Sequence, residues 1–84
     1  MDQEIDKAIY ERKYELTNQL ILSCYVENDK DATFINFKKA YINFRIETDS
    51  AFEILAITKA YDFLKLLSFE EIGYIYKGLI NSEE

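Results

Sequence analysis

Hydrophobic residues recur every three or four positions along most of the chain, the spacing that gathers them on one face of an α-helix. Polar clusters at 27–31, at 47–50 and around Ser68 divide this pattern into four segments. The segments predict helices over about residues 3–26, 33–46 and 51–67 and from residue 69 onward. We therefore expect an all-α fold, a small compact bundle of about four helices, as one domain over residues 1–84 with residues 82–84 frayed.

The first segment carries two adjoining apolar stripes on one side of its helix. One stripe contains Ile5, Ile9, Leu16 and Leu20, and the other contains Tyr10, Tyr14, Ile21 and Tyr25. Tyr10 and Tyr14 fall at the margin of the packed side. Because a tyrosine joins an apolar ring to a polar hydroxyl, these two residues suit either the edge of a core or a binding surface.

The second segment fits two interpretations. Aromatic residues at helical spacing are Phe34, Phe37, Tyr41 and Phe44, and a second stripe contains Ile35, Ile42 and Ile46. On this interpretation Asp31 or Thr33 caps the helix. The same residues alternate with polar ones toward the end of the segment, so the alternative is an α+β fold with a β-hairpin at about 33–47. We favour the helix, because Lys39 and Ala40 lack the glycine, asparagine or aspartate of a tight hairpin turn.

The third segment is apolar around most of its circumference. One side contains Phe52, Leu55, Phe63 and Leu66, and the other contains Ile54, Ile57, Tyr61 and Leu64. Such a helix either lies at the centre of the bundle or exposes a second face that a partner covers. We predict that a partner interface contains Ile54, Ile57, Tyr61 and Leu64, together with Tyr74, which falls off the apolar face of the last helix.

Helix start signals support the last two elements. Ser50 stands three residues before Glu53, and Ser68 stands three residues before Glu71. Each pair fits a capping box, in which the serine hydroxyl and the glutamate carboxylate each accept a backbone N–H at the start of the helix. The chain also has no proline and only two glycines, so it lacks the turn residues of an all-β protein.

The residue inventory removes most catalytic chemistry. The chain has no histidine and one cysteine, so it cannot assemble Ser-His-Asp or Cys-His nucleophiles or a zinc site of the usual kind. Glu27, Asp29 and Asp31 are spaced like calcium ligands, but the glycine and the glutamate that an EF-hand loop needs further on are missing. An enzyme built on carboxylates alone is the remaining option. We expect no enzyme, no catalytic residue, no cofactor and no metal site.

The charge balance disfavours several partners. With 16 acidic and 10 basic residues, the net charge of −6 opposes binding to nucleic acid and to anionic membranes. Lys38, Lys39 and Arg45 form the only concentrated basic group, so one alternative is a small DNA-binding transcriptional regulator that uses helix 33–46. A second alternative is an acidic DNA mimic.

The supply of Ile, Tyr and Phe exceeds what one small bundle can hide, which favours a protein partner. We therefore expect a non-enzymatic protein that binds another protein, with a homodimer as one arrangement and a basic target as the favoured partner. A phage- or mobile-element-encoded inhibitor that blocks a host protein, of the anti-CRISPR, anti-sigma or immunity type, would act in this way. No apolar run is long enough to cross a bilayer, and acidic residues stand where an export signal would be basic, so we expect a cytoplasmic protein.

Overall fold

The computed structural model describes residues 2–82, which form four α-helices and no strand. The helices are α1 (Asp2–Cys24), α2 (Lys30–Glu47), α3 (Ala51–Leu66) and α4 (Phe69–Ser82). The predicted all-α bundle of four helices is confirmed, and the alternative hairpin at 33–47 is wrong because α2 runs through that segment. Ser82 ends α4, whereas residues 83 and 84, for which fraying is expected, lie outside the described part of the chain.

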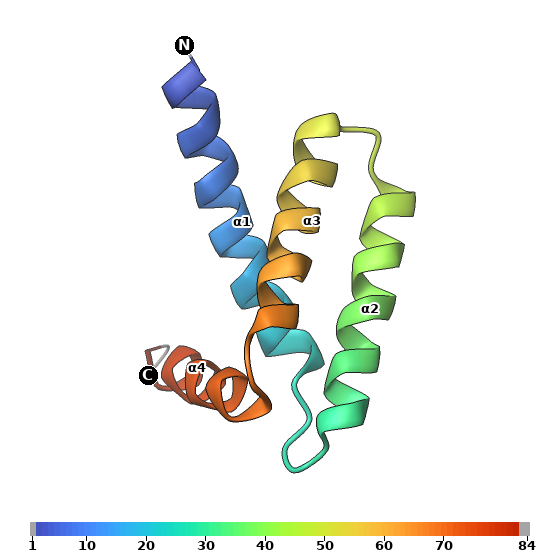
Figure 1. Ribbon diagram of the computed structural model, residues 1–84, viewed down its shortest axis with the longest axis vertical. Helices are drawn as coiled ribbons and strands as arrows, with labels where there is room; N and C mark the ends of the chain where they lie inside the picture. Colours follow the sequence, from blue (N-terminus) through green and yellow to red (C-terminus); the bar gives the residue numbers. More distant parts are fainter. Residues whose placement is uncertain (1, 83–84) are drawn as a thin grey trace.

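The first three helices lie side by side, and the fourth turns sideways from the end of α3, away from α2 (Figure 1). α2 runs antiparallel to α1 and α3, and α3 lies between the other two. α4 packs mainly against the C-terminal part of α1. The N-terminal turns of α1 diverge from the bundle, and all of its residues from 3 to 8 are exposed. This divergence gives the molecule an elongated shape of 42 × 27 × 23 Å.

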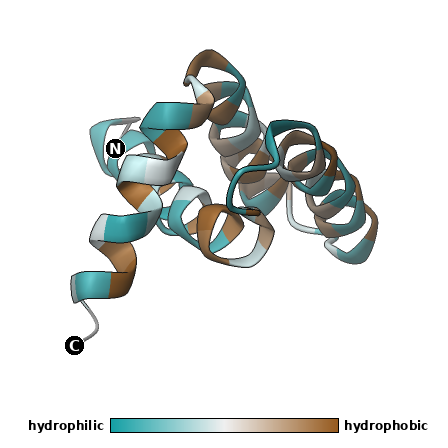
Figure 2. Cartoon of the chain, turned by 90° about the horizontal axis from the view of Figure 1, so that it is seen from below, coloured by the Kyte–Doolittle hydropathy of each residue, from teal (hydrophilic) through white to brown (hydrophobic). Residues whose placement is uncertain are grey.

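One hydrophobic core joins the four helices. Its largest fully buried hydrophobic residues are Leu16, Ile21, Phe37, Ile57, Leu64 and Ile72. Hydrophobic residues also recur on the outside of the helices, where they alternate with polar ones (Figure 2). The core therefore uses only part of the apolar supply, as the sequence indicates.

The start of α2 differs from the sequence prediction. Asp29, rather than Asp31 or Thr33, is the N-cap, and its Oδ1 accepts the N–H of Ala32 at 3.0 Å. Asn28, one residue earlier, has φ 62°, a left-handed conformation that asparagine tolerates better than most residues. The chain reverses direction here in a few residues, so the helix can begin earlier than its hydrophobic pattern does.

Thr33 is fully buried and closes the turn between α1 and α2. Its Oγ1 accepts the N–H of Val26 at 2.9 Å and lies 2.8 Å from the carbonyl oxygen of Asp29, to which it donates. This hydroxyl thus satisfies a backbone donor that the end of α1 leaves without a helical acceptor. A residue expected to cap a helix therefore holds two helices together.

The two expected capping boxes have different outcomes. Ser68 and Glu71 form the full box: the Glu71 carboxylate accepts the Ser68 N–H at 2.8 Å, and the Ser68 hydroxyl accepts the Glu71 N–H at 3.1 Å. The backbone hydrogen bond from Ser68 lowers the pKa of Glu71. Ser50 accepts the N–H of Glu53 at 3.2 Å, but the Glu53 carboxylate turns away to accept from Arg12 of α1 at 2.7 Å. Half of this box is therefore exchanged for a link between α1 and α3.

Tyr25 docks α4 onto the end of α1. Its ring lies 5.6 Å from the ring of Phe69 and 4.6 Å from that of Tyr76, measured between centroids. A Cβ built at Gly73 would lie only 2.9 Å from the Tyr25 hydroxyl oxygen. Glycine at this position lets α4 approach the tyrosine closely, which fixes where α4 crosses α1.

Candidate protein-binding surfaces

The predicted interface stripe on α3 lies inside the bundle. Ile57 and Leu64 are 1% and 0% exposed, and Ile54 and Tyr61 are half-buried. The Tyr61 ring stacks on Tyr41 of α2 at 4.4 Å. The expectation that this stripe is free for a partner is wrong, because α3 lies between α1 and α2 and this is the side that packs against them.

Tyr74, the fifth predicted interface residue, is 84% exposed on α4. Its position off the packed face agrees with the helical phase read from the sequence. The structure does not bring Tyr74 together with the α3 stripe, since that stripe is buried and Tyr74 faces solvent. Its role in an interface stays a prediction.

The exposed apolar side of α3 is the opposite one. Phe52, Leu55, Phe63 and Leu66 are all exposed, and Leu66 reaches 83%. Across from it on α1, Tyr10 and Tyr14 are also exposed, at 63% and 62%. Hydrophobic residues of two helices therefore face solvent where α1 and α3 meet.

All of these residues except Phe52 line what we call the aromatic groove, formed by two hollows that share Tyr10, Lys13 and Phe63. One hollow, of about 700 Å³, lies between α1 and α3 and is lined by Ile9, Leu55 and Leu66 among others. The other, of about 570 Å³, lies between α1 and α4 and is lined by Tyr14, Ile75, Gly78 and Leu79 among others. The groove thus runs along α1, with α3 and α4 as its other walls.

Lys13 lies where the two hollows meet. Its Nζ is 4.5 Å from the centre of the Phe63 ring and 5.5 Å from that of Tyr10. An ammonium group this close to two aromatic faces is attracted by both, with about 0.5–1 kcal/mol expected for each at an exposed site. The interaction links Lys13 and Tyr10 of α1 to Phe63 of α3 at the middle of the groove.

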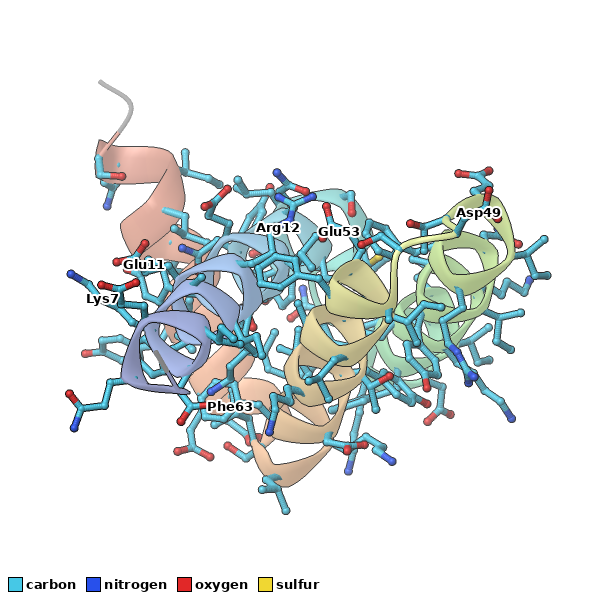
Figure 3. The ribbon with its side chains drawn as sticks, turned by 90° about the horizontal axis from the view of Figure 1, so that it is seen from above. Lys7, Glu11, Arg12, Asp49, Glu53 and Phe63 are labelled. Atoms are coloured by element: carbon cyan, nitrogen blue, oxygen red, sulfur yellow. The ribbon has the colours of Figure 1, made fainter. Side chains whose placement is uncertain are left out.

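A charged link fixes the other side of the α1–α3 contact. Arg12 and Glu53 turn toward each other there, while Phe63 lies on the groove side (Figure 3). The pair joins Arg12 Nε to Glu53 Oε2 at 2.7 Å, with both side chains about three-quarters buried. This hydrogen bond is the main reason that the pKa of Arg12 is raised above its usual value. The Arg12–Glu53 pair anchors α1 beside α3, which holds two walls of the groove in place.

Charged side chains of both signs line the groove. Its two hollows are lined by the carboxylates of Asp6 and Asp62 and by the ammonium groups of Lys13 and Lys59. The carboxylates of Glu11 and Glu15 line a neighbouring hollow on α1. Three of these acids approach cations on their own helices, at distances of 3.2 to 4.0 Å. Such exposed pairs contribute little free energy, so these carboxylates remain open to a new partner.

Other kinds of site receive no support from the described residues. Within residues 2–82, no three His, Cys, Asp or Glu side chains gather as metal ligands would. The four helices described here also lack the length and apolar character that crossing a membrane requires. Comparisons with protein families, with curated proteins and with solved structures find no match to this chain.

Some residues of the groove could be predicted from the sequence pattern. Tyr10 and Tyr14 stand at the margin of the first helix, as expected, and the exposed side of α3 is one of the two stripes that its apolar pattern defines. Ile75 and Leu79 have the four-residue spacing of a packed helix face, and this spacing alone does not indicate that they line a groove. Their place in the groove depends on where α4 crosses α1, which the pattern within α4 does not encode.

Proposed function

We propose that this chain is a non-enzymatic protein-binding module whose aromatic groove docks an amphipathic helix of a partner protein. The observation that carries the proposal is the pair of adjoining hollows that form the groove, with Tyr10, Phe63 and Leu66 from two helices exposed to solvent along it. Small domains rarely leave such patches uncovered, and tyrosine is enriched among residues that dominate binding. A groove between helices fits an amphipathic helix that presents apolar residues at every third or fourth position.

The favoured partner helix is basic along the flanks of its apolar stripe. Charges in the lining of the groove balance, but the carboxylates of Glu11 and Glu15 lie next to it on α1, and the whole chain has a net charge of −6. Complementary charge speeds association and suppresses the wrong partners. A bound helix would be withheld from its other contacts, so a chain of this kind acts as an inhibitor or regulator of the protein it binds.

Two synthetic amphipathic helical peptides test this function. They share one leucine stripe, and their flanking residues are lysines in one and glutamates in the other. In an NMR titration of the labelled protein, the lysine peptide should perturb amides around Tyr10, Phe63 and Leu79, and its affinity should fall as salt is added.

Two serine substitutions, at a leucine and an isoleucine of similar exposure, serve as test and control for the contribution of the groove to binding. Leu66→Ser lies in the groove, where the residue is 83% exposed, and Ile46→Ser lies on α2, where it is 76% exposed. Because the bound peptide would bury the Leu66 side chain, its loss should weaken binding of the lysine peptide by about tenfold. Ile46→Ser should change it by less than about twofold, because that residue is outside the groove.

The proposal is wrong if the lysine peptide does not saturate the protein, or if Leu66→Ser leaves its affinity unchanged. Sedimentation of the free protein tests the competing occupant, a second copy of this chain. A dimer that Leu66→Ser converts to a monomer would show that the groove is a homodimer interface instead.

A further inference from the structure

A second exposed apolar surface lies on α2, apart from the aromatic groove. We call it the α2 stripe, and it consists of Ile35, Ile42 and Ile46, which are 52%, 43% and 76% exposed. Intervals of seven and four residues set the three side chains in one row along the helix. The row lies on the side opposite Phe37, which is fully buried against the rest of the bundle. No residue is shared between the α2 stripe and the groove.

Cations surround this stripe in a chain that is otherwise acidic. Lys38 and Lys39 are exposed on opposite flanks of the row, between Ile35 and Ile42 in the sequence, and Arg45 lies on the same flank as Lys38. Arg45 donates to the Tyr41 hydroxyl at 3.0 Å and lies 5.4 Å from the centre of its ring, which holds the guanidinium beside the stripe. The acids on this helix, Asp31 and Glu47, lie at its two ends.

The charge pattern identifies the occupant. In a two-fold symmetric dimer the same surface of both copies is in contact. A second copy would therefore place its lysines next to those of the first, whether the two α2 helices run parallel or antiparallel. Duplex DNA would meet a row of isoleucines where polar side chains must reach base edges. An acidic helix with its own apolar stripe matches both the isoleucines and the lysines.

We infer that the α2 stripe is a second binding site, for an acidic amphipathic helix of a partner protein. The apolar residues of that helix cover Ile35, Ile42 and Ile46, and its carboxylates face Lys38 and Lys39. Because the aromatic groove favours a basic helix and lies on other elements, the chain can hold two partners of opposite charge at once. It would then act as an adaptor, which adds a second partner to the function proposed above.

The glutamate peptide described above is the probe for this site. In the NMR titration it should perturb amides from Ile35 to Ile46 and leave those around Phe63 unchanged. Ile46→Ser should weaken its binding by about tenfold, whereas Leu66→Ser, matched in exposure, should change it by less than about twofold. Lys38→Glu combined with Lys39→Glu should abolish the preference for the glutamate peptide over the lysine peptide, because it reverses the charge on both flanks of the row.

The second site is wrong if the glutamate peptide shows no saturable binding, or if Ile46→Ser does not weaken that binding. It is also wrong if a short DNA duplex binds more tightly than the glutamate peptide and the two lysine substitutions abolish the DNA binding. The first two outcomes leave the groove proposal standing, since that proposal depends on the lysine peptide and on Leu66. A ternary mixture with both peptides should show both sets of perturbed amides together. Mutual exclusion would contradict the adaptor role.

Discussion

At the scale of single residues, the hydroxyl of Thr33 links two helices through hydrogen bonds to the backbone. It is the buried polar group that joins the end of α1 to the start of α2, through the N–H of Val26 and the carbonyl of Asp29. Within residues 2–82, every buried side-chain nitrogen or oxygen has a hydrogen-bond partner. Removing this hydroxyl would leave the backbone N–H of Val26 without its acceptor at the turn.

We predict that Thr33→Val destabilises the protein by about 1–3 kcal/mol, because the N–H of Val26 loses its acceptor. Thr33→Ser is the control: it keeps the hydroxyl and removes only a buried methyl group, at a cost of about 1 kcal/mol. Urea unfolding followed by circular dichroism measures both. A valine variant as stable as the wild type would show that the hydroxyl contributes nothing.

The sequence predicted some of the helix caps correctly and others not. Ser68 and Glu71 form the expected box because both partners lie next to each other on one helix. Glu53 leaves its box for Arg12, which is 41 residues away in the sequence, and no local pattern encodes such a partner. Thr33 was expected as a cap because its type fits one, but the turn before it made Asp29 the cap and buried Thr33 instead.

At the scale of elements, the helices could be predicted from the sequence, and the side of α3 that packs could not. The period of apolar residues gave the four helices to within a few residues at each end. On α3, however, both stripes are apolar, so the pattern cannot decide between them. The decision comes from Tyr41 of α2 and from the residues of α1 that reach the side of Ile57 and Leu64, contacts that exist only once the helices are packed.

The crossing of α4 over α1 gives a prediction about Gly73 and Tyr25. Gly73→Ala should destabilise the protein by about 1 kcal/mol, because the new Cβ would be 2.9 Å from the tyrosine oxygen and the cost of overpacking exceeds the gain in helix propensity. In Tyr25→Phe that oxygen is absent, and the nearest remaining ring carbon is 3.5 Å away, an ordinary contact.

The same substitution should therefore change sign in the second background. Gly73→Ala in Tyr25→Phe is expected to be neutral or to stabilise by up to about 1 kcal/mol, as alanine favours helix over glycine. Thermal unfolding of the four proteins of this double-mutant cycle measures the coupling. Additive effects would mean that the hydroxyl does not limit how closely α4 approaches.

At the scale of the whole molecule, exposed hydrophobic residues coexist with a net charge of −6. This charge keeps copies apart near neutral pH and disappears near the isoelectric point of about 4.6. We predict that light scattering shows self-association as the pH falls toward this value. The double variant Leu66→Ser/Ile46→Ser should scatter less, since it removes the two most exposed aliphatic side chains from both surfaces. Equal scattering at neutral pH and near the isoelectric point would contradict this expectation.

The way α4 is attached also affects the aromatic groove. α4 packs mainly against α1, so it is the element that can open locally, with loss of Ile72 from the core, while the other three helices keep their contacts with one another. When it opens, the hollow lined by Ile75 and Leu79 is lost, and the hollow between α1 and α3 remains. A ligand that reaches α4 would shift this local equilibrium toward the closed form by mass action, whereas a shorter ligand would leave it unchanged. The length of the bound helix would thus determine how much of the protein it stabilises.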